Sequence, residues 1–529
     1  MLSKYLIFFL SLFILFVLSC ERTPEIKEPF SLTGASSADA KRLLPLFASD
    51  SASADISGRI FNGLTKYDKD LNIVGDLAES WTISKDGKEI IFYLRKGVRW
   101  HDGTEFTAED VVFTYKSVID SKNPTPYSSN YGPVKEVKVI DKYTVKVIYE
   151  KPFAPALESW GMGILPKHLL EGKELFNSPL NRKPTGTGPY KMKEWITGQR
   201  VILERNENYY EGIPFFEKFI IRIIPDPSTM FLELRFGGID FMGLNPAQYK
   251  YYGEKSYFKK YFNVYRYPSF GYTYIGYNLK DPLFSEKKVR QAIAHAINKK
   301  EIIEGVLLGY GTPCTGPFPP SSWAFNPNVK DFEYNPEKAK EFLHELGWKP
   351  DNEGILTKDG RKFSFVLLVN QGNEARLKTA QIIKEQLKKI GIELNIRVLE
   401  WQSFLELVTK RQFQAVLLGW SLSRDPDLYD IFHSSKTKPG EFNFVGYSNK
   451  EVDNLIEKAR QIIDKEKRKK LYWRIHEIIT EDQPYTFLYV PDTIIAVNKR
   501  IRGIEPALAG IWHNYIFWYV PKNRMDWYN

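Results

Sequence analysis

The chain has 529 residues, too many for a single hydrophobic core, so its length indicates two or three domains. The formal charge is +10, but the basic residues are spread rather than clustered, which argues against a nucleic-acid-binding protein. Phe, Trp and Tyr make up 15% of the residues, enough to fill cores and also to stack on a ligand.

The amino terminus has the layout of an export signal. Lys4 precedes an apolar run at residues 5–18 that is too short to span a bilayer comfortably. The tetrapeptide Val-Leu-Ser-Cys that ends at Cys20 resembles the bacterial lipobox, whose cysteine is lipidated; the alternative is an ordinary signal peptide that contains a cysteine. We expect a lipoprotein signal peptide at residues 1–19 and a tether at residues 20–29.

This layout predicts an extracytoplasmic or periplasmic protein that an N-terminal lipid holds at the membrane. The only other cysteine is Cys314, so no internal disulfide is expected unless Cys20 stays unmodified. We expect Cys314 to be buried or half-buried and unreactive.

Small polar side chains open the segment at residues 49–61. Asp50 and Ser51 are suited to cap a helix that runs to Phe61. Together with Ser49 they could equally line a cleft.

Short elements follow towards the middle of the chain. Residues 89–94 predict a strand, and residues 95–103 predict a loop that ends in an Asp-Gly turn. Thr107 then caps a predicted helix through Tyr115, with Asp110 at the third helical position.

The block F-Y-L-R-K-G-V-R-W-H-D-G-T-E-F-T-A-E-D-V-V-F-T-Y-K, residues 92–116, closely resembles the signature of bacterial extracellular solute-binding proteins of family 5. These are the oligopeptide- and dipeptide-binding components of ABC importers. Further motifs occur in the family's order at residues 186–190, 205–210, 289–297, 347–348 and 446–453. The resemblance covers essentially the whole chain after the signal peptide.

The resemblance implies an α/β protein with the type II periplasmic-binding-protein fold, in which two α/β lobes surround a cleft and a small extra lobe is specific to the family. The implied division is lobe I at residues 30–66, 184–268 and 504–529, lobe II at residues 67–183, and lobe III at residues 269–503.

The last lobe is also supported by hydrophobic periodicity. Residues 363–369 and 392–398 predict strands around a helix that ends at Gly391. Residues 401–411 then predict a second helix and residues 415–418 a buried strand. The order β-α-β-α-β predicts a parallel sheet.

The strand at residues 415–418 ends at Trp420 and opens into a polar loop that carries Ser423, Arg424 and Asp425. In open α/β sheets, ligands bind in the crevice beyond the carboxyl ends of the strands. In many peptide-binding members, an aspartate three residues after the tryptophan that corresponds to Trp420 pairs with the ligand's α-amino group. Ser423 stands at that position here, so Asp425 is our candidate for the role; the alternative is that Asp425 caps a helix that begins at the next proline.

Aromatic side chains such as Trp401, Trp420 and Tyr274 would form the walls of roomy side-chain pockets, and core packing is the alternative for each. The predicted ligand-binding residues are Ser49, Asp50, Ser51, Tyr131, Trp160, Tyr274, Asn278, Trp401, Trp420, Ser423, Arg424 and Asp425.

The densest basic run is residues 467–470, Lys-Arg-Lys-Lys, inside an amphipathic helical stretch with apolar Ile462, Ile463, Leu471, Ile475 and Ile478. This pattern predicts a solvated basic face.

The search for catalytic motifs is negative. The chain contains no Walker A, H-E-x-x-H, C-x-x-C or G-x-S-x-G pattern. His101 lies in the family signature and is expected to have a structural hydrogen-bonding role. The Gly186-Thr-Gly188 stretch predicts a turn, because it lacks the third glycine of a dinucleotide-binding loop.

The main hypothesis is therefore a lipid-anchored, monomeric receptor that captures an extended peptide between two lobes and delivers it to the permease subunits of an ABC importer. The alternative keeps the fold but binds a non-peptide solute such as a nickel chelate, haem or a sugar. A hydrolytic enzyme is the weakest hypothesis. No cofactor, catalytic residue or metal site is predicted.

Overall fold

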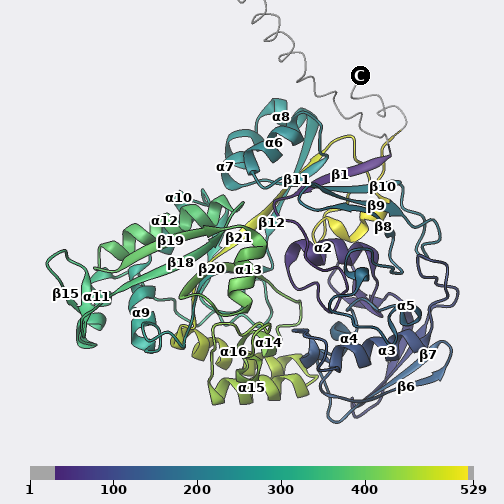
Figure 1. Ribbon diagram of the computed structural model, residues 1–529, viewed down its shortest axis with the longest axis horizontal. Coiled ribbons are helices and arrows are strands. Elements are labelled where there is room, and N and C mark those ends of the chain that lie inside the picture. Colours follow the sequence, from purple (N-terminus) through teal and green to yellow (C-terminus); the bar gives the residue numbers. More distant parts are fainter. Residues whose placement is uncertain (1–29, 522–529) are drawn as a thin grey trace, which may run out of the picture.

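The computed structural model describes residues 30–521 (Figure 1). The predicted signal peptide, Cys20 and the tether therefore lie outside the described residues. Within residues 30–521, no helix combines the length and the apolar composition that a bilayer crossing requires.

A twelve-stranded mixed sheet crosses the molecule (Figure 1). In spatial order its strands are β19 (Glu393–Leu399), β18 (Ser364–Asn370), β20 (Ala415–Ser421), β13 (Gly271–Tyr277), β21 (Tyr485–Asn498), β11 (Phe241–Gly243), β1 (Ser31–Ser36), β10 (Lys218–Ile223), β9 (Arg200–Arg205) and β8 (Tyr190–Ile196). Strands β12 (Phe262–Pro268) and β14 (Gly311–Pro313) pair with β21 beside this path.

Strand β21 joins the two halves of this sheet. Its first part, to Tyr489, pairs with β13, and its last part, from Ile495, pairs with β11. Strand β12 runs antiparallel beside the same last part. The sheet is therefore continuous from the predicted lobe III into the predicted lobe I, whose boundaries stay a prediction.

The predicted β-α-β-α-β unit is confirmed. Helix α12 (Glu374–Lys388) connects β18 to β19, and α13 (Trp401–Thr409) connects β19 to β20. Strand β18 lies between β19 and β20 and is parallel to both. The side chains of residues 415–418 are buried, as the continuous apolar run predicts.

A separate four-stranded antiparallel sheet lies at the lower right of Figure 1. Its strands, in spatial order, are β4 (Ala78–Ile83), β5 (Glu89–Leu94), β7 (Thr144–Tyr149) and β6 (Val134–Asp141). Helix α3 (Ala108–Ile119) packs against it and begins with the predicted capping box, in which Thr107 and Asp110 satisfy each other's backbone N–H groups.

The basic run at residues 467–470 lies in a helix as predicted, but one of its four side chains is not solvated. Two helices cover this region, α15 (Lys450–Gln461) and α16 (Lys465–Asp482), and residues 462–464 connect them. Lys467 and Lys470 are exposed, but Arg468 is buried and forms an ion pair. Hydrophobic periodicity could not reveal the burial of Arg468, because its partner Asp425 belongs to a distant segment of the sequence.

The remaining helices surround the sheets. They are α2 (Ser51–Ile60), α4 (Ala156–Ser159), α5 (Lys167–Leu170), α6 (Pro227–Arg235), α7 (Pro246–Gln248), α8 (Ser256–Tyr261), α9 (Lys287–Ala296), α10 (Lys299–Gly305), α11 (Pro336–Glu345) and α14 (Tyr429–Phe432). Short strands complete the fold: β2 (Thr65–Tyr67), β3 (Ile73–Gly75), β15 (Lys349–Pro350), β16 (Leu356–Lys358) and β17 (Arg361–Lys362).

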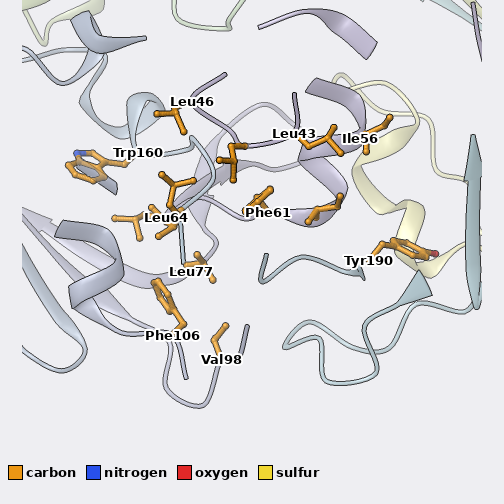
Figure 2. Packing of buried hydrophobic residues seen from close by; sticks show 14 of the residues in the cluster. Leu43, Leu46, Ile56, Phe61, Leu64, Leu77, Val98, Phe106, Trp160 and Tyr190 are labelled. Carbon is orange, nitrogen blue, oxygen red and sulfur yellow. The ribbon is translucent and has the colours of Figure 1, made fainter. Parts of the chain in front are cut away.

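One large buried cluster joins α2 to the elements beneath the four-stranded sheet (Figure 2). Its labelled side chains are Leu43, Leu46, Ile56, Phe61, Leu64, Leu77, Val98, Phe106, Trp160 and Tyr190. This packing fixes α2 against the rest of the chain and so positions the residues at its amino end.

The loop at residues 186–188 closes on the carboxyl end of α2. A Cβ atom built on Gly186 would lie 1.8 Å from the carbonyl oxygen of Ile60, so only glycine fits there. The backbone N–H of Gly188 donates to that same oxygen at 2.8 Å. The stretch is a turn, as predicted.

Candidate functional site: a cavity between the lobes

A cavity of about 1660 Å³ lies among segments that are distant in the sequence. Its lining includes parts of β1 and α2, residues 124–131 and 155–163, the amino end of α12, one side of α13, and the carboxyl end of β20 with the loop after it. Eight of the predicted ligand-binding residues are in this lining: Ser49, Asp50, Ser51, Tyr131, Trp401, Trp420, Ser423 and Asp425.

Two of the three predicted tryptophans, Trp401 and Trp420, are partly exposed in the cavity. Trp420 follows the buried part of β20, and its ring stacks on Phe444 with centroids 5.8 Å apart. Its Nε1–H donates to the hydroxyl of Tyr485 at 3.4 Å. The indole is therefore held at one edge while the other remains available to a ligand.

Asp50 contacts Trp401 across the cavity. Its carboxylate caps α2 by accepting from the backbone N–H and the hydroxyl of Ser53. The Nε1–H of Trp401 points to the same carboxylate at 3.5 Å. The two alternatives for Asp50, helix cap and cleft residue, are thus both true in the structure.

Four predicted residues lie outside the lining, and three of them have side-chain partners elsewhere in the protein. Trp160 is fully buried and donates to the hydroxyl of Tyr149. Tyr274 is fully buried and stacks on Tyr485. Asn278 donates to the carbonyl of Phe413 at the far end of β13.

Arg424 is the fourth of these residues. Its guanidinium lies over the ring of Phe270, 4.2 Å from the centroid. Its backbone N–H and its charge both act on Glu158 of the predicted lobe II.

Asp425 lines the cavity, but its carboxylate already has a partner. Nη2 of Arg468 donates to its Oδ1 at 2.7 Å, and both side chains are largely enclosed. Burial raises the pKa of Asp425 and the Arg468 charge opposes that shift. Asp425 does not cap a helix, since α14 begins after Leu428.

The same loop contains two more buried carboxylates with cationic partners. Asp427 pairs with Arg460 at 3.1 Å, and Asp430 pairs with Lys436 at 3.5 Å. Each pair replaces the hydration that the carboxylate loses on burial.

Glu158, which the sequence analysis missed, connects the two sides of the cavity. Its carboxylate accepts the backbone N–H groups of Arg424 at 3.2 Å and Asp425 at 2.8 Å. Burial, helped by the nearby charge of Asp425, raises the pKa of Glu158 to about 7. A lone glutamate in a four-residue helix has no sequence signal that marks it as a contact.

Other bonds cross the same junction. Arg460 donates to the carbonyl of Ser129 at 2.9 Å, and the Ser129 hydroxyl donates to Asp430. Gln402 donates to the carbonyl of Asp39 at 2.9 Å on the other side. These bonds join facing walls of the cavity in this structure.

The remaining sequence expectations concern His101 and Cys314. The His101 ring bonds to both ends of the 186–188 loop, which confirms its structural role. Cys314 is fully buried, and burial raises the pKa of its thiol to about 12. Among residues 30–521, no three or more His, Cys, Asp or Glu side chains are grouped so that they could hold a metal ion.

The sequence model for bacterial extracellular solute-binding proteins, family 5 middle, matches residues 72–443. The chain therefore belongs to this family of extracellular binding proteins, and its sheet and cavity are those of a type II periplasmic-binding-protein fold.

Individual relatives agree with this assignment. The oligopeptide-binding protein AppA of Bacillus subtilis (strain 168) is 40% identical over 490 residues, 90% of this chain and 89% of AppA. The solved structure of Bacillus subtilis AppA in complex with a nonapeptide has a TM-score of 0.89 and 38% identity, with 93% of this chain and 99% of that chain covered. The solved structure of NikZ from Campylobacter jejuni in complex with Ni(L-His) has a TM-score of 0.85 and 30% identity, with 93% of this chain and 100% of NikZ covered.

Proposed function

We propose that this protein is the substrate-binding component of an ABC importer and captures peptides in the interlobe cavity. The observation that carries this proposal is the size of the cavity, about 1660 Å³. Pockets for a single small ligand have volumes of roughly 300–1,000 Å³. The space here suits an extended, oligomeric ligand.

The strand dimensions allow an estimate of that ligand's length. A residue in an extended chain rises about 3.3 Å, and its neighbours lie about 4.8 Å and about 10 Å away in the two other directions, so it occupies roughly 160 Å³. A cavity of about 1660 Å³ thus has room for up to roughly ten residues. AppA, which has 38% identity with this chain, was crystallised with a nonapeptide.

The lining fits a peptide of variable sequence. Trp401 and Trp420 offer flat apolar surface, while Ser49, Ser51 and Ser423 offer hydroxyls. Hydrogen bonds to the peptide main chain would supply the affinity. Roomy side-chain pockets would allow peptides of different sequence to bind. Ligand-dependent closure between the predicted lobes would bury the peptide.

The rest of the import cycle belongs to other chains. The sequence contains no nucleotide-binding motif, which fits a receptor that passes its ligand to a permease with separate ATP-hydrolysing subunits. We propose that the protein acts as a monomer without catalytic activity, anchored through lipid on Cys20. A Cys20→Ser variant should be released from the membrane fraction; if it still fractionates with membranes, the anchor is elsewhere.

Thermal-shift screening with peptide pools tests the peptide proposal. A peptide at a hundred times its dissociation constant should stabilise the protein by about 2.7 kcal/mol. Pools of increasing length should show an optimum below about ten residues. Stabilisation by a metal chelate, haem or a sugar, and by no peptide, would instead support a non-peptide solute.

Asp425 stays a predicted contact for the ligand's amino group. The single variant Asp425→Asn would leave Arg468 buried without its carboxylate partner. The better comparison is therefore between wild type and the double variant Asp425→Asn, Arg468→Met. If Asp425 is the anchor, the double variant should no longer distinguish a free peptide from its N-acetylated form. Equal discrimination by both proteins would remove Asp425 from the site.

A further inference from the structure

Arg376 lines the cavity at the first turn of α12, three residues after the helix cap Asn373. Its Nη1 donates to the side-chain oxygen of Asn370 at 2.8 Å. A Cβ atom built on Gly419 would lie 2.8 Å from its Nη2, so the guanidinium occupies the space over this glycine. Arg376 therefore lies beside the carboxyl end of β20, next to Trp420.

No Asp or Glu of the described chain forms an ion pair with this guanidinium, and its Nε is enclosed without any hydrogen-bond partner. Burial is the main influence on the pKa of Arg376 and lowers it. Glu374 is nearby in sequence, but it accepts a hydrogen bond from Asn245. Asn370 is thus a neutral partner for a largely desolvated cation.

Four buried arginines of the described chain are matched by carboxylates. These pairs are Arg59 with Asp55, Arg460 with Asp427, Arg468 with Asp425, and Arg500 with Asp240.

Arg290 lies near Asp482, whose charge opposes the lowering of its pKa by burial, and it donates to the backbone carbonyls of residues 284, 285, 482 and 483. Within residues 30–521, Arg376 has neither a carboxylate nor a backbone carbonyl as a partner, only the side chain of Asn370. A cation that is only partly exposed and has only a neutral partner is costly, which makes Arg376 stand out as one that a ligand carboxylate would satisfy.

We propose that Arg376 binds a carboxylate group of the ligand inside the cavity. The inference rests on the proposed peptide-binding function and narrows its substrate class to peptides that present a carboxylate to the wall between Asn370 and Gly419. A planar guanidinium matches a carboxylate with two parallel hydrogen bonds. The carboxylate is either the peptide's carboxyl terminus or an Asp or Glu side chain.

The first test needs no ligand. If Arg376 is present for the ligand, Arg376→Gln should leave the Tm of the unliganded protein unchanged or raise it, because the variant removes an unmatched charge. Arg468→Gln is the matched control and should lower the Tm, because it leaves Asp425 buried and unpaired. A fall in Tm for Arg376→Gln as large as that of the control would overturn the proposal in favour of a structural arginine.

The second test uses the peptide with the largest thermal shift in the screen, titrated by calorimetry. Arg376→Gln should bind it at least ~30-fold more weakly than wild type. Arg376→Lys keeps the charge but cannot form two parallel hydrogen bonds to a carboxylate, so its affinity should lie between those of the other two proteins. Amidating the peptide's carboxyl terminus should cost wild type a similar factor if the terminus is the partner. If an acidic side chain is the partner, replacing Asp and Glu of the peptide by Asn and Gln should have that effect instead.

The outcomes separate this proposal from the proposed function. Peptide binding of equal strength by wild type and Arg376→Gln would retain the function and overturn the carboxylate subsite. If no peptide shifts the wild type, the function fails, and both proteins are then titrated with succinate and citrate. Stabilisation of wild type alone would retain the subsite, and stabilisation of neither or of both would overturn it.

Discussion

The loop after β20, residues 424–430, and the loop before β8, residues 186–188, are held by different interactions. The first contains three carboxylates, each paired with an enclosed cation. The second is held by neutral groups: the His101 ring, backbone N–H groups, and glycines that touch Ile60.

The charged loop lines the cavity and the neutral loop does not. Ion pairs there place fixed charges next to the ligand space, whereas the neutral contacts only fix the position of α2. This difference predicts two kinds of destabilisation. Removing one partner of an ion pair in the first loop should lower the stability of the protein strongly. In the second loop, an added side-chain atom or acid pH should lower it.

The largest effect on stability is expected for Arg468→Met, which leaves the buried Asp425 carboxylate without its cationic partner. We expect a loss of about 3 kcal/mol in the free energy of unfolding, measured in urea, because a buried charge without its partner is costly. Adding Asp425→Asn should restore most of that loss. If the double variant is as unstable as the sum of the single variants, the pair contributes no coupling.

In the neutral loop, Gly186→Ala should cost about 1–3 kcal/mol, because its Cβ would overlap the carbonyl of Ile60. Gly58→Ala in α2 is the matched control, since a Cβ there meets nothing within 4 Å. The control should gain about 0.5–1 kcal/mol through helix propensity. A Gly186→Ala protein as stable as wild type in urea would show that the loop can move away.

Acid should loosen the same loop. Burial lowers the pKa of His101 to about 4 from an ordinary value of 6.5, so its contribution is present above pH 6.5 and is lost as the pH falls towards 4. Protonation would place a hydrogen on Nδ1, which accepts from the N–H of Gly186. Tm measured from pH 7 to 4 should fall less steeply for His101→Gln than for wild type.

Glu158 should have the smallest effect on the pH dependence of the Tm. Its contribution to stability is lost as the pH rises, whereas that of His101 is lost as the pH falls. The pKa of Glu158 is raised from 4.5 to about 7, so its contribution is present below pH 4.5 and is lost as the pH rises through 7. Between pH 5 and 8, the Tm of Glu158→Gln should therefore decline less than that of wild type. Parallel profiles would mean that Glu158 is ionised at both ends of this range.

Local signals predicted the elements well. The capping residues Asp50 and Thr107 begin the helices expected of them, and the alternation and apolar runs of residues 363–418 give the observed parallel unit. These signals depend on neighbours within a few positions, so one sequence contains them.

Side-chain roles were predicted less well. Trp420 and Tyr274 are both aromatic residues in adjacent strands, yet Trp420 faces the cavity and Tyr274 lies in the core. Arg468 looked like part of a solvated face and is buried against Asp425, 43 positions away. Periodicity shows which face is apolar but not which distant segment covers it.

The sequence by itself determined the family, the helices and strands, and the strand end at Trp420 beside which the cavity lies. Only the tertiary structure decided which charges meet: Asp425 with Arg468, Glu158 with the amides of residues 424 and 425, and Arg376 with no carboxylate of the described residues. The reason is physical. Propensity and amphipathicity act over a few residues along the chain, whereas the pairing of buried charges depends on distances that exist only after segments hundreds of residues apart have packed together.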